Sequence, residues 1–185
     1  RDVRDEAPVH DVDVEPVGSG SDGLAISSGG SVVRGFAIHG FDRAIYLSGG
    51  GGSTIANNHI GTNLAGDTGI ANQYGIWVDS SNNLIGGTGA ADRNVISGNT
   101  IDGVVLRGSN NTVAGNYIGT DRTGTLAIGN GEDGVWLYGG SGNTVGGDTS
   151  GARNVIAANG WAGVAASNLG ADHVIYQPYD LFSHM

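Results

Sequence analysis

Two acidic residues of this chain occupy equivalent places in a repeated phrase and could form a catalytic pair. Asp102 and Asp133 each stand directly before a glycine that opens an aliphatic run, one repeat apart. If a repeat is one turn of a coiled chain, their carboxyl groups would lie about 5 Å apart, a separation typical of retaining glycosidases. With Asp79 and Arg107 nearby, an acid-bound cation and an arginine base of a lyase can also be drawn. Every repeat of a stacked fold places like residues at that distance, and Asp before Gly is a common turn choice, so the pattern favours a structural role over catalysis.

Aromatic residues recur in the same phrase, between its two inward-pointing apolar residues. Side chains alternate across a strand, so we expect this middle position to face solvent. The six copies hold Ala25, Tyr46, Trp77, Val105, Trp136 and Ala165 there. Flat rings on one exposed line could stack on alternate sugars of an extended polysaccharide, while polar neighbours supply hydrogen bonds. The predicted ligand-binding residues are Tyr46, Trp77, Trp136, Tyr138, Arg107 and Asp79. The β-propensity of Trp and Tyr would also place them there, and such a line could instead be a protein contact.

The phrase that positions these residues is small, aliphatic, any, aliphatic, and it recurs six times. The copies are residues 23–26, 44–47, 75–78, 103–106, 134–137 and 163–166. Such a period, a few tens of residues, is typical of a solenoid. Two further short runs of alternating apolar residues follow within a repeat, as at 111–113 and 116–118. Three short strands per repeat, joined by turns rich in Gly and Asn, predict an all-β parallel β-helix of about six coils.

Stacked coils would align like residues in continuous columns. One predicted core column is Ile45, Ile76, Val104 and Val135, beside a second of Leu47, Val78, Leu106 and Leu137. A corner column of Asn58, Asn94, Asn116 and Asn154 is expected to form a hydrogen-bonded ladder. The long loops alternate between two corners, with Asn63 and Asp121 as turn formers at one of them. The alternation indicates duplication of a two-coil unit.

With these phrases the chain resembles a family of bacterial extracellular right-handed β-helix repeat proteins, related in architecture to pectate lyases. The matching runs are residues 116–121, 129–135, 146–147 and 153–156. The resemblance covers about residues 20–165 and implies a right-handed helix and a secreted or cell-surface location. It transfers no catalytic motif to this chain.

The composition excludes several classes of partner and binding site. The formal net charge is −10, with 8 Lys plus Arg against 18 Asp plus Glu, so we expect no nucleic-acid partner. No apolar run is long enough for a membrane span, so we expect no membrane insertion. The absence of cysteine excludes disulfides and thiolate metal sites. We expect no cofactor. The chain opens on Arg1 rather than Met, which predicts a processed product or an excised fragment.

The ends of the chain depart from the repeat. The predicted parts are 1–22, a lead strand or partial coil; 23–166, the β-helix repeats; and 167–185, a non-repeat cap or docking element. Asp11, Asp13 and Glu15 could bind calcium, although the same pattern is that of a solvated strand. Open helix ends predict a homodimer.

The whole pattern predicts an extracellular structural or adhesive β-helix module that binds polysaccharide along its aromatic strip. The alternative is a polysaccharide lyase or glycoside hydrolase on the same scaffold.

Overall fold

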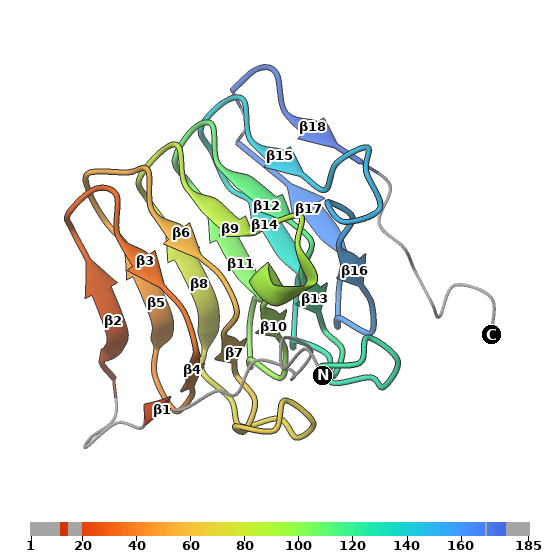
Figure 1. Ribbon diagram of the computed structural model, residues 1–185. Coiled ribbons are helices and arrows are strands. Elements are labelled where there is room, and N and C mark those ends of the chain that lie inside the picture. The colour runs from red at the N-terminus through yellow and green to blue at the C-terminus, as the bar shows by residue number, and fades with distance from the viewer. Residues whose placement is uncertain (1–11, 15–19, 169, 177–185) are drawn as a thin grey trace, which may run out of the picture.

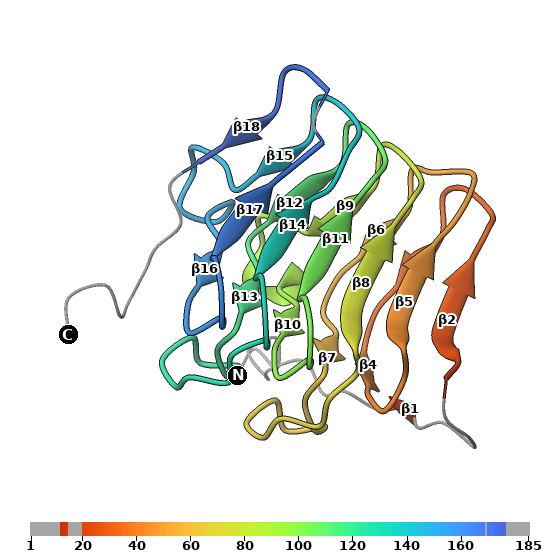
Figure 2. The ribbon, with the colours of Figure 1, turned by 180° about the vertical axis from the view of Figure 1, so that it is seen from behind.

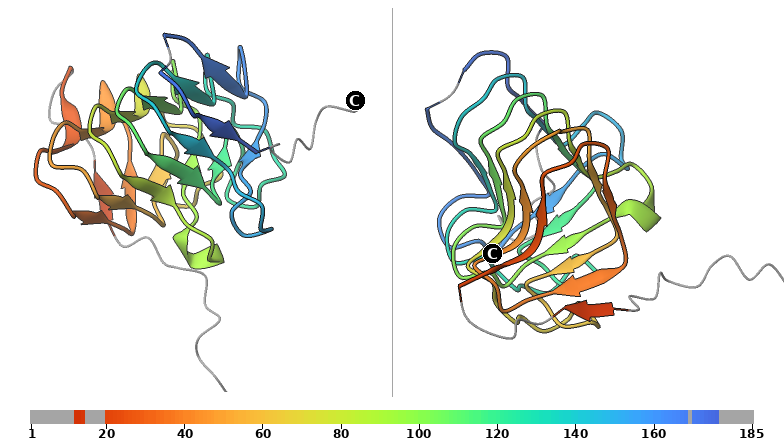
Figure 3. Two further views of the ribbon diagram at one scale, coloured as in Figure 1. Left: turned by 90° about the horizontal axis from the view of Figure 1, so that it is seen from above. Right: turned by 90° about the vertical axis from the view of Figure 1, so that its left-hand side faces the viewer.

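The chain winds into a solenoid of short strands that form three parallel sheets. The computed structural model describes residues 12–14, 20–168 and 170–176, and within them the strands number eighteen. Each coil contributes one strand to each sheet, and neighbouring coils lie one behind another when viewed along the axis (Figure 3). The fold is the predicted right-handed parallel β-helix of about six coils, with three short strands in each.

The first sheet contains the strands of the repeated phrase. They are β2 (Asp22–Ile26), β5 (Arg43–Leu47), β8 (Tyr74–Val78), β11 (Val104–Leu106), β14 (Val135–Leu137) and β17 (Val164–Ala166). The second sheet consists of β3 (Val32–Val33), β6 (Thr54–Ile55), β9 (Leu84–Gly86), β12 (Thr112–Ala114), β15 (Thr144–Val145) and β18 (Val174–Ile175).

The third sheet closes each coil. It consists of β1 (Val12–Val14), β4 (Phe36–Ile38), β7 (His59–Ile60), β10 (Val95–Ile96), β13 (Tyr117–Ile118) and β16 (Val155–Ile156). A single 3-10 turn, η1 (Ala90–Asp92), interrupts the strands of the described residues. It lies in the long loop between β9 and β10 (Figure 1).

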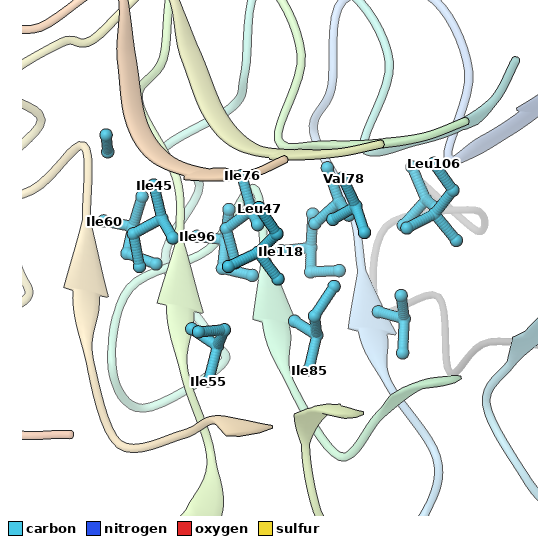
Figure 4. Packing of buried hydrophobic residues seen from close by; sticks show 14 of the residues in the cluster. Ile45, Leu47, Ile55, Ile60, Ile76, Val78, Ile85, Ile96, Leu106 and Ile118 are labelled. Carbon is cyan, nitrogen blue, oxygen red and sulfur yellow. The ribbon is translucent and has the colours of Figure 1, made fainter. Parts of the chain in front are cut away.

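Apolar columns from the three sheets meet on the axis of the solenoid (Figure 4). The register aligns Ile45 with Ile76, Ile76 with Val104, and Val104 with Val135. All four side chains are fully buried, so the predicted core columns are confirmed. Burial of one such side chain contributes about 1.5–3 kcal/mol. A lone coil would leave both edges of its row in water, so the core forms only when coils stack.

The predicted asparagine ladder runs along the corner before the third sheet. The Nδ2 of Asn58 donates to Oδ1 of Asn94 at 3.1 Å, and Asn94 donates to Asn116 at 2.9 Å. The Nδ2 of Asn116 continues the series to Oδ1 of Asn154 at 3.2 Å. The same amides also donate to backbone carbonyls of the corner, such as that of Ile85. The ladder therefore satisfies buried backbone groups where the chain turns, and the prediction is confirmed.

Two further asparagine ladders, not predicted from the sequence, occupy the other two corners. Asn72, Asn99, Asn130 and Asn159 form one, through Nδ2 to Oδ1 bonds of 2.8–2.9 Å. In the other, Asn83 Nδ2 donates to Asn111 Oδ1, and the Asn111 backbone amide donates to Asn143 Oδ1. The sequence carried the signal, because an asparagine stands shortly before the glycine of four phrases and directly before three strands of the second sheet. Each corner of the helix thus carries its own amide stack.

The alternating long loops have the geometry expected of a duplicated two-coil unit. A bridge between Thr62 and Gly69 closes one loop, and Thr120 pairs with Ala127 in its counterpart two coils later. The Asn63 side chain accepts from the amides of residues 67 and 68, and Asp121 accepts from those of residues 125 and 126. The predicted turn formers are therefore confirmed.

The strands continue past the predicted end of the repeats. β1 pairs with β4, as expected of a lead strand, and β18 pairs with β15 and so extends the second sheet beyond residue 166. Asp11, Glu15 and residues 177–185 lie outside the described residues, so the calcium and cap predictions fall largely there. At this end Trp161, Ile175 and Tyr176 are exposed. The homodimer through open ends stays a prediction.

We predict that the middle of a ladder contributes more to stability than its end. Asn116→Ala would leave the Asn94 amide and the Ile85 carbonyl without their partner, which should lower the free energy of unfolding by about 2–4 kcal/mol. Urea unfolding followed by circular dichroism measures the change. Asn159→Ala is the matched control, because Asn159 accepts from Asn130 but its own Nδ2 has no partner. Equal losses in the two variants would contradict the prediction.

Candidate functional site

The predicted aromatic column lies on the outer face of the first sheet. β5, β8, β11 and β14 run side by side there (Figure 2). Their register places Tyr46 opposite Trp77, Trp77 opposite Val105, and Val105 opposite Trp136. The three aromatic residues are therefore aligned along the axis, with one aliphatic residue between the two indoles.

The expectation that every residue of this column faces solvent is wrong for Val105. Its side chain is fully buried, whereas Tyr46, Trp77 and Trp136 are half-buried. The cause is the difference in size, because a small side chain between two indole-bearing strands is covered by its neighbours. The surface is thus a continuous cluster of rings and polar groups and not a row of separate rings.

Asp79 holds one half of this cluster together. Its carboxylate accepts a hydrogen bond from the Tyr46 hydroxyl at 2.8 Å and another from Trp77 Nε1 at 3.1 Å. It also forms an ion pair with Arg107, with Nη1 and Oδ1 3.2 Å apart. The bond to Asp79 and partial burial raise the pKa of Tyr46 above its ordinary value. The phenol therefore stays a donor at neutral pH and fixes the orientation of its ring.

Arg107 joins this half to the second aromatic pair. Its guanidinium carbon lies 5.7 Å from the ring centres of both Trp77 and Tyr138. The Trp136 and Tyr138 rings are 4.3 Å apart between centroids, and Trp136 Nε1 donates to Ser167 Oγ at 2.9 Å. All six residues predicted to bind a ligand are thus brought into one connected group.

A shallow, open depression of about 500 Å³ lies within this face. Asp79, Arg107, Tyr138, Gly139 and Asn168 line it. Gly139 and Asn168 were not among the predicted site residues. They follow Tyr138 and Ser167 in the turns that leave the first sheet, and nothing in their residue types marked them as part of a site.

Asp102 and Asp133 stack on successive coils as predicted, but their carboxylates serve the backbone. Asp102 is 1 % exposed and its Oδ1 accepts from the Asp133 amide at 2.9 Å. Asp133 is 7 % exposed and accepts from the Ala162 amide at 3.0 Å. One carboxylate oxygen of each acid is therefore bonded to a backbone amide of the next coil. This geometry does not support a catalytic role for the two residues. The lyase or hydrolase alternative stays a prediction.

One oxygen of Asp102 makes no such bond. Oδ2 is buried and has no hydrogen-bond partner. Burial raises the pKa of Asp102 to about 6, and the nearby charges of Asp133 and Glu132 act in the same direction, against the hydrogen bond from the Asp133 amide. The carboxyl group is therefore half protonated in mildly acidic solution.

The described ranges, 12–14, 20–168 and 170–176, contain neither a candidate metal cluster nor a candidate membrane-spanning helix. No three His, Asp or Glu side chains gather there in a way that could hold a metal ion. Within the same residues, no helix has the length and apolar character of a membrane span.

We predict that Asp102 lowers the free energy of unfolding as the pH rises. The folded chain keeps this proton up to about pH 6, whereas the unfolded chain loses it near 3.8. The free energy of unfolding is therefore highest below about pH 4, where Asp102 is protonated in both states. It falls as the pH rises, and the fall is complete once the pH has passed 6. Relative to wild type, Asp102→Asn should therefore gain up to about 3 kcal/mol in unfolding free energy between pH 4 and pH 7.

Urea unfolding at several pH values measures this difference. Asp148→Asn, which removes a carboxylate from an exposed loop, is the control for net charge. A difference between Asp102→Asn and wild type that does not grow with pH would refute the assignment.

The comparisons with known proteins agree with the architecture. The family described as "Right handed beta helix region" matches residues 9–150, which is more than half of the chain. Comparison with curated proteins finds no match, and neither does comparison with solved structures. On the strength of the family match and the stacked parallel strands, the chain belongs to the right-handed β-helix family.

Proposed function

We propose that this chain is an extracellular structural or adhesive module that binds polysaccharide on the outer face of its first sheet. The observation that carries the proposal is the alignment of Tyr46, Trp77 and Trp136 in one column. Asp79 bonds to two of these rings, and its ion-pair partner Arg107 lies beside Trp77. The extracellular setting rests on the family resemblance of the sequence.

The chemistry of this face suits a sugar. Aromatic rings offer flat apolar surface for the C–H faces of a sugar, and the polar groups beside them can hydrogen-bond its hydroxyls. The half-buried rings of Trp77 and Trp136 each have their indole N–H bonded within the protein, to Asp79 and Ser167. Because the rings are already oriented, little side-chain entropy is lost when a ligand binds.

The spacing of the two indoles also favours an extended polysaccharide chain rather than a compact ligand. Trp77 and Trp136 are two coils apart in one column, which places them about 10 Å apart along the axis. The stacked coils fix this spacing. A linear polysaccharide that runs along the solenoid axis would meet one indole and then the other.

We predict that the two indoles together contribute most of the affinity. In affinity gel electrophoresis over a panel of soluble polysaccharides, Trp77→Ala with Trp136→Ala should weaken binding at least about tenfold, as for central aromatic anchors. Circular dichroism checks that the variant is folded. Trp161→Ala is the matched control, because Trp161 is 73 % exposed and lies before β17, outside the aromatic column. Unchanged binding by the double variant would contradict the proposal.

A further inference from the structure

We infer that the polysaccharide held on this face is uncharged, and that one of its sugars occupies the depression beside the Asp79–Arg107 pair. This inference rests on the proposed function and adds the class of ligand to it. It follows from how the charges of the face are paired.

Each arginine in contact with the aromatic column already has an acidic partner. Arg43 forms a two-pronged bond with Asp22, at 2.7 and 2.9 Å, and its guanidinium carbon lies 3.7 Å from the centre of the Tyr46 ring. Arg107 pairs with Asp79. Recognition of a carboxylated or sulfated sugar relies on a cation that is free to pair with it. Neither arginine is free in this sense.

The charge around this face is also unfavourable for an anion. The chain carries 18 acidic residues against 8 basic ones. Glu132 and Asp133 stand just before β14, at the start of the strand that bears Trp136. An approaching polyanion would meet a negative field, which slows association and weakens the bound state.

The paired groups still have hydrogen-bonding capacity that matches hydroxyl groups. Arg107 has five N–H donors, and its side chain is 45 % exposed. The Tyr138 hydroxyl and the exposed Asn168 amide can each donate and accept at the same depression. A sugar hydroxyl is both donor and acceptor, so it can bond to these groups without separating Arg107 from Asp79.

A side chain at residue 139 would take up part of the depression. Gly139 lines it, and a Cβ on this residue would come no closer than 3.5 Å to its nearest neighbour, the Arg107 carbonyl oxygen. This is an ordinary van der Waals contact, so a Cβ fits at residue 139. Gly139→Val adds two methyl groups beyond that Cβ and changes no charge or ring, and circular dichroism checks that it folds. It tests whether the sugar sits in the depression.

The experiment compares neutral and acidic probes on the same protein. Wild type is run in native gels that contain soluble β-glucan, galactomannan or xylan, and in gels that contain polygalacturonate, alginate or hyaluronate. We expect a neutral polysaccharide to bind at least about tenfold more tightly than any polyuronate, as expected when an anion lacks a free cation. Gly139→Val should lose most of the neutral binding.

Asp79→Asn tests the charge pairing directly. It keeps the size of the side chain but releases Arg107, so affinity for polyuronates should rise about fivefold and this gain should fade in higher salt. Asp148→Asn makes the same change in net charge on an exposed loop and should leave the preference as in wild type.

The outcomes separate the two proposals. A wild-type preference for a polyuronate, an unchanged preference in Asp79→Asn, or full neutral binding by Gly139→Val would overturn the inference and leave glycan binding standing. If none of the polysaccharides retards the wild type, the inference and the proposed function both fall.

Discussion

The structure depends on the satisfaction of backbone polar groups at the three corners of each coil. Strands of two to five residues cannot by themselves hold a parallel stack, because the chain turns after every strand and leaves amides and carbonyls buried. The asparagine amides fill that need. Each has one acceptor and two donors, so it can bond the previous coil, the next coil and its own corner at once. Asn116 makes all three kinds of bond.

The same stacking arranges the outer surface. Once coils lie in register, any position of the repeat becomes a column along the axis, whether it holds a core isoleucine or a surface tryptophan. The face of the first sheet is therefore stiff, and its side chains are held by neighbours from adjacent coils. Asp79, which lies in the turn after β8, is an example. It accepts a hydrogen bond from Tyr46 of the preceding coil and forms an ion pair with Arg107 of the next coil. A surface of this kind suits an elongated ligand better than a compact one.

Acidic residues on the two sides of the repeated phrase have different roles. Asp79 lies at the surface and orders aromatic and basic side chains around it, whereas Asp102 is buried and accepts from the next coil's backbone. Stacking brings like residues close in every column. Proximity of two carboxylates in a solenoid is therefore weak evidence for catalysis, and burial decides between a structural acid and a reactive one.

The sequence by itself determined the coil, the three strands of each repeat, the core columns and one asparagine ladder, because these features recur and each copy supports the others. It also determined that Tyr46, Trp77 and Trp136 share a column. Only the tertiary structure decided that Val105 is covered, that Asp102 is buried with one unpartnered oxygen, and that Asp79 binds Tyr46, Trp77 and Arg107 together. The physical reason is that periodicity fixes which residues stack, whereas burial and pairing depend on the sizes and charges of the side chains that stacking brings together.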